Sequence, residues 1–237
     1  MNVTRICLLG LPRCGSQYIS NVIARSVGPN MQNLGEPFTA GHPYNIIQKN
    51  NLLYSTTSDF TKYTSLREQI NYVFSLLKNS NQEQSLVLKL FLNNRVFTFL
   101  SEILNELSAL NFKFLIMKRE NTEYQLVSWL VATATNKFDS TYGMHDKPIF
   151  INNDLCHDVI GLYESILNFD KVLAEYKIEA DCIRYEHAVL DLTMHFQKKM
   201  NIDIARKKQL PNNPYDMIEN ADEVRKYLNI LMSRKEQ

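Results

Sequence analysis

"ICLLGLPRCGSQYISNVIARSV", residues 6–27, is the stretch that decides the predicted fold. A short apolar run comes first, then a turn bracketed by Gly10 and Gly15, then apolar residues at helical spacing until a Gly-Pro pair ends the pattern. A glycine-containing turn between a strand and a helix directs backbone N–H groups at an anion, and the helix dipole adds partial positive charge there. The stretch therefore predicts a phosphate-binding loop.

The predicted loop lacks the lysine of nucleoside triphosphatases. Its glycines have the G-x4-G spacing of a Walker A loop, but Ser16 and Gln17 stand where that loop has Lys and then Ser or Thr. The cation for a γ-phosphate and the hydroxyl for magnesium are both replaced. Arg13 supplies a cation from inside the loop instead. We therefore expect a phosphate compound other than a magnesium-bound triphosphate.

Composition limits the class of protein. The chain has 237 residues, 45% hydrophobic and 22% charged, which is typical of a globular protein with one sizeable core. A net charge of +1 gives no reason to expect nucleic acid or a membrane as partner. The cysteines form no CxxC pair, and the apolar run of residues 6–11 is too short to span a bilayer, so we expect a cytoplasmic protein with free thiols. These cysteines are Cys7, Cys14, Cys156 and Cys182.

Strand patterns alternate with helix patterns along the rest of the chain. This alternation predicts an α/β fold: a single domain over residues 1–237 with a central parallel sheet of about five strands flanked by helices. Ligands of such sheets bind at the carboxyl ends of the strands. We expect strands at 6–11, 86–91, 112–119 and 180–186, an extended piece ending in a turn at 31–38, a loop over the site at 39–64, and helices at 16–27, 65–77, 96–110, 122–136, 154–176 and 188–200.

Two helix starts carry capping signals. Ser65 precedes one helical pattern and is expected to accept a hydrogen bond from its first turn. Asn220 precedes the last pattern, and Glu223 follows three residues later, which is a capping-box arrangement.

The loop resembles a known family. "LGLPRCGSQYISNVI" is similar to the 5′-phosphosulfate loop of the P-loop sulfotransferases, whose common form is Pro-Arg or Pro-Lys followed by Ser-Gly-Thr-Thr. Cys14 replaces the small hydroxyl residue and Gln17 replaces the second Thr. The matching positions are Pro12, Arg13, Gly15 and Ser16.

A second motif, "LIMKRENTEYQLVSWLVA", resembles the family's 3′-phosphate site. The form Arg-x-Asp/Asn-x-x-x-Gln-x-x-Ser is most similar to bacterial carbohydrate sulfotransferases of the trehalose type, although Tyr124 stands where many of them have Arg. "IRYEHAVLD", residues 183–191, more loosely resembles a strand-end stretch of the same family. The residues that carry the second motif are Arg119, Asn121, Gln125 and Ser128.

The resemblance implies a nucleotide-kinase-like sulfotransferase fold and a donor, 3′-phosphoadenosine 5′-phosphosulfate (PAPS). Transfer of its sulfuryl group to a hydroxyl of a carbohydrate or small metabolite would leave adenosine 3′,5′-bisphosphate. Because this donor has no β- or γ-phosphate, no metal is expected. The donor-binding residues implied are Pro12, Arg13, Cys14, Gly15, Ser16, Gln17, Arg119 and Ser128, with Arg206 from the basic loop "ARKKQL" as a further candidate against a merely solvated charge.

Catalysis requires a general base for the acceptor hydroxyl. Glu36, in "NLGEPF", is the first choice because the related enzymes have a catalytic Glu in such a stretch, and His42 is the alternative. Lys89 interrupts an apolar strand, where an unpaired ammonium would be costly. It is expected to reach the strand end and act with Arg13 on the donor, against the alternative that it pairs with a surface carboxylate.

The sequence is also compatible with two other functions. One is a P-loop kinase with an altered loop, which would use ATP and magnesium; the other is a nucleotide-binding or interaction protein without catalysis. The acceptor is not encoded in any motif, and its contacts are expected from residues 39–64 and 138–153. A homodimer is the base-rate expectation, with no motif to support it.

Overall fold

The computed structural model describes residues 3–27, 31–39, 45–56, 65–135, 148–197 and 213–233. By its internal contacts the chain divides into two compact units. The first, Met1–Lys118 with Leu173–Arg206, is called the sheet unit. The second, Arg119–Val172 with Lys207–Gln237, is called the helical unit.

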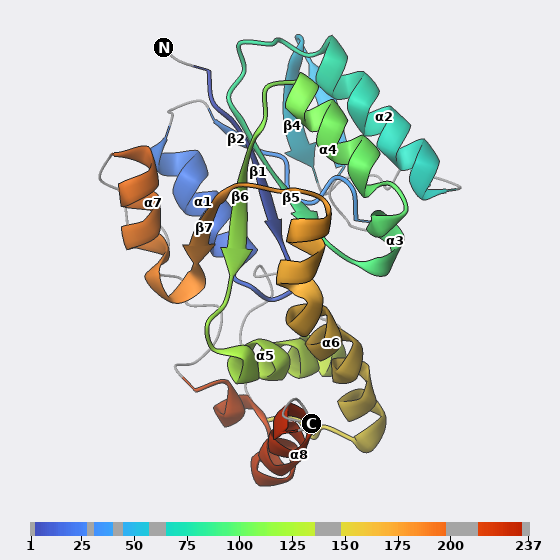
Figure 1. Ribbon diagram of the computed structural model, residues 1–237, viewed down its shortest axis with the longest axis vertical. Helices are drawn as coiled ribbons and strands as arrows, with labels where there is room; N and C mark the ends of the chain where they lie inside the picture. Colours follow the sequence, from blue (N-terminus) through green and yellow to red (C-terminus); the bar gives the residue numbers. More distant parts are fainter. Residues whose placement is uncertain are drawn as a thin grey trace. The chain divides into compact units, whose positions relative to one another are not determined.

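A five-stranded parallel sheet forms the centre of the sheet unit (Figure 1). The strand order β2-β5-β1-β6-β7 puts the strand that leads into the glycine loop in the middle. The prediction of an α/β fold with a central parallel sheet of about five strands is confirmed. The strands are β1 (Arg5–Gly10), β2 (Gln32–Asn33), β5 (Leu86–Phe91), β6 (Lys113–Lys118) and β7 (Asp181–Arg184).

Helices cover both faces of this sheet (Figure 1). One face is covered by α1 (Ser16–Ser26) and α7 (Ala188–Phe196), and the other by α2 (Leu66–Asn79) and α4 (Leu100–Ala109). Apolar residues of α1 and α7 interlock with strand residues in one buried cluster, which fixes α1 against the sheet. This cluster includes Ile6, Leu8, Ile19, Val22, Ile23, Val87, Leu115, Ile183 and Leu192.

A β-hairpin occupies part of the segment that was expected to be a loop. Within residues 39–64, β3 (Asn45–Lys49) pairs antiparallel with β4 (Leu52–Thr56) as a separate two-stranded sheet, so the loop prediction is wrong for these residues. The turn between the strands is Asn50-Asn51, and both residues have left-handed backbone, with φ of 52° and 61°. Asparagine tolerates this conformation better than most side chains, and positive φ at both central residues is what a type I′ hairpin turn requires.

One predicted helix is broken in two. Residues 96–110 were expected to be continuous, but the structure has α3 (Asn94–Phe97) and then α4. Phe99 interrupts the helix with φ −117° and ψ 4°, and its N–H donates to Val96 in a tighter turn. Apolar periodicity continues across the break, which is why the pattern does not reveal it.

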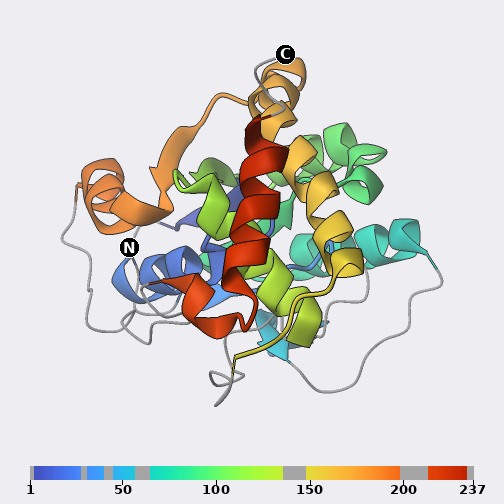
Figure 2. The same ribbon diagram turned by 90° about the horizontal axis from the view of Figure 1, so that it is seen from below.

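The helical unit contains α5 (Thr122–Thr135), most of α6 (Asn153–Glu175), a 3₁₀ turn η2 (Pro214–Met217) and α8 (Ala221–Ser233). Figure 2 shows α8 running beside α6, where the Tyr163 hydroxyl donates to the Met232 carbonyl at 3.2 Å. The Tyr215 hydroxyl donates to Glu123 on α5, which attaches η2 to that helix. Among the helices in the described ranges, none combines the length and the apolar character needed to cross a membrane.

The two capping predictions have different outcomes. The Ser65 hydroxyl accepts the Glu68 N–H at 3.2 Å, so this N-cap is confirmed. Asn220 was expected to cap α8, but its side chain accepts the Ile151 N–H and donates to the Ile151 carbonyl, both at 2.9 Å. Glu223 accepts from the Asn220 side chain rather than from its backbone. The capping-box prediction is therefore wrong, because a distant backbone segment satisfies the Asn220 amide more completely.

Candidate functional site

The glycine loop is a tight turn between β1 and α1. Arg13 and Gly15 both have left-handed backbone, with φ of 63° and 84°, and the Cys14 N–H donates to the Leu11 carbonyl at 3.4 Å. α1 begins at Ser16, directly after this turn. The first helical turn consists of uncharged residues, so no carboxylate of its own opposes an anion there. The predicted order of strand, turn and helix is present.

Lys89 is the most deeply buried charged side chain near this loop. It lies on β5 opposite Leu8 of β1, on the sheet face that α1 covers, and is 2% exposed. Its ammonium donates to the Gln17 side-chain oxygen at 2.8 Å and to the Glu36 carboxylate at 2.9 Å. The partner of Lys89 is thus a carboxylate that is itself largely buried, with 12% of its side chain exposed, and not a surface group.

Glu36 lies on a turn that the rest of the sheet unit holds in place. The preceding Gly35 has φ of 69°, and its carbonyl accepts a hydrogen bond from the backbone N–H of Lys89 at 2.7 Å. After the glutamate, the side chain of Gln69 on α2 donates to the Pro37 carbonyl at 2.7 Å. Glu36 is therefore presented from a fixed turn, unlike the solvated glutamate that usually precedes a proline.

Gln69 is a supporting residue that the sequence reasoning missed. It is 9% exposed and stands beside Ile70 in a helix whose inward positions are otherwise apolar. A buried amide needs hydrogen-bond partners, so this polar residue on an apolar stripe is the signal from which it could have been found.

Cys14 contributes packing rather than a polar side chain. The thiol is buried in the cluster beneath α1, and burial raises its pKa from the ordinary 9.0 to about 12. Lys89 and the Ser16 N–H oppose this rise only in part. The Cys14 side chain is thus a neutral thiol at physiological pH, and donor binding by this residue stays a prediction.

The second motif is carried by the start of the helical unit. Arg119 follows the last residue of β6, and Asn121 is the N-cap of α5, since its side-chain oxygen accepts the Tyr124 N–H at 2.8 Å. Gln125 and Ser128 are buried on α5, with 3% and 1% exposure. The Asp or Asn of this motif therefore has a local structural role. That Arg119 and Ser128 bind a 3′-phosphate stays a prediction.

Two predicted residues, His42 and Arg206, lie outside the described residues. Of the two candidate general bases, Glu36 is therefore the one whose surroundings the structure describes. Pro12 and Arg13 are partly exposed in the loop. In the described ranges, no group of three or more His, Cys, Asp or Glu side chains could hold a metal ion, and the expectation that transfer needs no metal stays a prediction.

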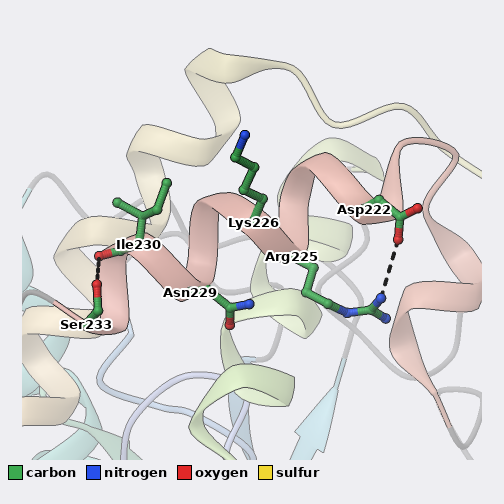
Figure 3. A pocket seen from close by; sticks show the side chains of 6 residues that line it. All are labelled: Asp222, Arg225, Lys226, Asn229, Ile230 and Ser233. Atoms are coloured by element: carbon green, nitrogen blue, oxygen red, sulfur yellow. Dashed lines mark hydrogen bonds and ion pairs between the residues drawn. The ribbon is translucent and has the colours of Figure 1, made fainter.

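A hollow on α8 is lined by none of the predicted site residues (Figure 3). Every side chain that lines it comes from this one helix and is exposed, and Arg225 forms an ion pair with Asp222 at 3.4 Å. Such a lining is the solvated face of a helix and contributes nothing to the candidate site. The lining residues are Asp222, Arg225, Lys226, Asn229, Ile230 and Ser233.

Comparison with known proteins does not assign a family. A scan against protein-family models finds no match to this chain, and a search of curated proteins finds none either.

Proposed function

We propose that this protein is a PAPS-dependent sulfotransferase of the P-loop sulfotransferase fold, acting in the cytoplasm on a hydroxyl of a carbohydrate or small metabolite. The observation that carries the proposal is the contact of Lys89 with both Gln17 and Glu36. These residues come from a strand, the first turn of α1 and a separate turn, and each was assigned to the site from sequence on its own. Their meeting beside the glycine loop supports one common site.

The residues present fit a phosphosulfate. Backbone amides and the dipole of α1 suit an oxyanion, Arg13 adds a cation from within the loop, and Lys89 adds a second cation from the neighbouring strand. When bound, PAPS supplies an activated sulfuryl group that needs no β- or γ-phosphate ligand. This explains why a loop without the Walker lysine would serve the donor.

Glu36 and Lys89 have different roles in the transfer. Glu36 takes the proton from the attacking hydroxyl, since its carboxylate is held on a fixed turn close to the loop. The Lys89 ammonium stabilises negative charge that develops beside it. Arg119 and Ser128 are assigned to the 3′-phosphate by resemblance alone.

A second candidate, an ATP-dependent P-loop kinase, is favoured by one observation. The Lys89 ammonium lies beside the first turn of α1, so a cation from β5 could take over the work of the missing Walker lysine. Against it, the position of the magnesium-binding hydroxyl is held by Gln17, an amide whose oxygen already accepts from Lys89. The kinase therefore ranks second.

Calorimetric titration separates these functions. We expect adenosine 3′,5′-bisphosphate to bind wild type more tightly than ATP with magnesium, and Arg119→Ala to lose about ten- to hundredfold in affinity, because the arginine would bond a phosphate. Arg25→Ala, at the exposed far end of α1, is the matched control and should bind normally. Tighter binding of ATP would favour the kinase, and binding of neither ligand would overturn both.

Transfer is then measured with labelled PAPS and a panel of hydroxyl acceptors, with water as the reference acceptor. Glu36→Gln should keep bisphosphate affinity and lose transfer, because the amide retains the shape of the carboxylate but not its basicity. Bisphosphate binding without transfer to any acceptor would indicate the non-catalytic alternative.

A further inference from the structure

The Gln17 amide is oriented by its neighbours. A lysine ammonium only donates hydrogen bonds, so the Gln17 oxygen must face Lys89, and the Gln17 nitrogen then faces the other way. That nitrogen donates to the side-chain oxygen of Asn21, one helical turn later, at 3.4 Å. The Lys89 contact thus continues into a chain of side-chain amides along α1.

A second chain arrives at the same oxygen from the Glu36 turn. The Gly35 N–H donates to the Asn33 side-chain oxygen at 3.0 Å, and the Asn33 nitrogen donates to Asn21 at 3.2 Å and to the buried Ser20 hydroxyl at 3.0 Å. The backbone N–H of Lys89 also donates to the Gly35 carbonyl. The amides therefore close a ring between the lysine ammonium and the turn before the glutamate.

The direction of every hydrogen bond in this ring is determined. Each of the two chains of amides begins at a group that can only donate, the Lys89 ammonium in one and the backbone N–H of Gly35 in the other. Both chains end on the side-chain oxygen of Asn21. Reversing any amide would set two donors or two acceptors against each other, and the mismatch would pass along the ring to an end group that cannot adapt.

We infer that Gln17, Asn21 and Asn33 are positioning residues that hold the Lys89 ammonium and the Glu36 turn in a fixed relation. They touch neither the donor nor the acceptor in this role. Gln17 thereby has a function that explains its departure from the threonine of the sulfotransferase loop: it binds Lys89 rather than a phosphate. The effect on transfer rests on the proposed function, whereas the ring itself does not.

The polarity of the ring gives a matched pair of variants. Asn21→Asp keeps an oxygen where two donors converge, so the ring should persist. Asn33→Asp loses the nitrogen that donates to Asn21 and Ser20, so the ring should break. Both substitutions change one atom and add one negative charge close to the same loop, so their general effects on anion binding should be similar.

The first readout is the NMR signal of the Lys89 ammonium, assigned by its loss in Lys89→Met. A buried, hydrogen-bonded ammonium exchanges slowly enough to be observed. We expect the signal in wild type and Asn21→Asp, and its shift or disappearance in Asn33→Asp. Equal spectra for the two aspartate variants, or loss in Asn21→Asp alone, would overturn the inference. If Asn33→Asp does not fold, Asn21→Leu removes the shared acceptor and should give the same loss.

The second readout is transfer of label from PAPS to water or to an acceptor. Asn33→Asp should lower the rate by about tenfold or more, and Asn21→Asp by less than about threefold, with bisphosphate affinities that agree within about threefold. Equal rates in the two variants would show that the ring does not position catalytic groups. If the NMR contrast appears but wild type neither binds bisphosphate nor transfers label, the ring stands and the proposed function fails.

Discussion

The ring of Tyr185 lies directly against Gly15. A Cβ atom added to this glycine would be 1.9 Å from Cδ2 of the tyrosine, and Tyr185 also contacts the ring of Tyr18 edge-on, with centroids 5.8 Å apart. The aromatic residue that follows β7 thus braces the turn that follows β1. Gly15 is required here for two reasons, because its φ of 84° also disfavours any side chain.

Gly15→Ala should destabilise the fold by about 3 kcal/mol or more, since the substitution adds both backbone strain and a clash. Gly161→Ala is the control: Gly161 is on α6 with nothing within 4 Å of an added Cβ, and alanine should stabilise that helix by about 0.5–1 kcal/mol. Urea unfolding measures both. Adding Tyr185→Ala to Gly15→Ala should recover part of the loss, and full additivity would contradict the proposed clash.

Lys89→Met should cost about 3 kcal/mol of unfolding free energy, because it removes a buried ammonium from the Glu36 carboxylate and the Gln17 amide. Lys78→Met tests the same pairing at the surface. Lys78 forms an ion pair with Glu106 at 2.7 Å, but the two side chains are 52% and 36% exposed, so the expected cost is below about 1 kcal/mol. Equal costs in thermal or urea unfolding would mean that burial does not decide the strength of the Lys89 pair.

Asp191→Asn should reduce stability at neutral pH and not at acidic pH. The Arg184 side chain donates to Asp191 and lowers the pKa of this carboxyl below its ordinary 3.8. A lowered pKa means stabilisation that is present above the ordinary pKa and is lost as pH falls through the folded value. Because the arginine side chain is 44% exposed, we expect only about 1 kcal/mol at pH 7. Urea unfolding at pH 7 and pH 3 measures this difference.

The control for that experiment is Asp222→Asn. The Asp222 side chain is 99% exposed, and its carboxylate pairs with Arg225. This substitution should show no comparable pH-dependent change. If Asp191→Asn loses as much unfolding free energy at pH 3 as at pH 7, the effect of this substitution comes from packing rather than from charge.

Cys14 should resist alkylation in the folded protein. With a pKa of about 12 against the ordinary 9.0, its thiolate fraction at pH 8 is lower by about a thousandfold, and the sulfur is buried as well. Cys182 is exposed on β7 and should react with iodoacetamide under the same conditions. Peptide mass spectrometry measures both sites, and unfolding in urea should make them equally reactive. Rapid modification of native Cys14 would show that the loop opens.

Much of the fold could be predicted because its signals are local. The glycine turn, the apolar strands and the Ser65 cap each depend on residues within a few positions of one another, and the structure has all of them. The break at Phe99 and the Asn50-Asn51 hairpin were missed, the first because apolar periodicity runs through it and the second because a short two-stranded signal was taken as loop.

The sequence by itself determined a parallel α/β sheet, a strand-turn-helix loop suited to an anion, and a buried lysine that needed a partner. Only the tertiary structure decided which partner. Lys89 and Gln17 are 72 positions apart, and they meet because β5 packs beside β1 and α1 covers that face of the sheet. A charge buried in a sheet must be satisfied, which the chain reveals locally, but strand order and helix packing select the group that satisfies it.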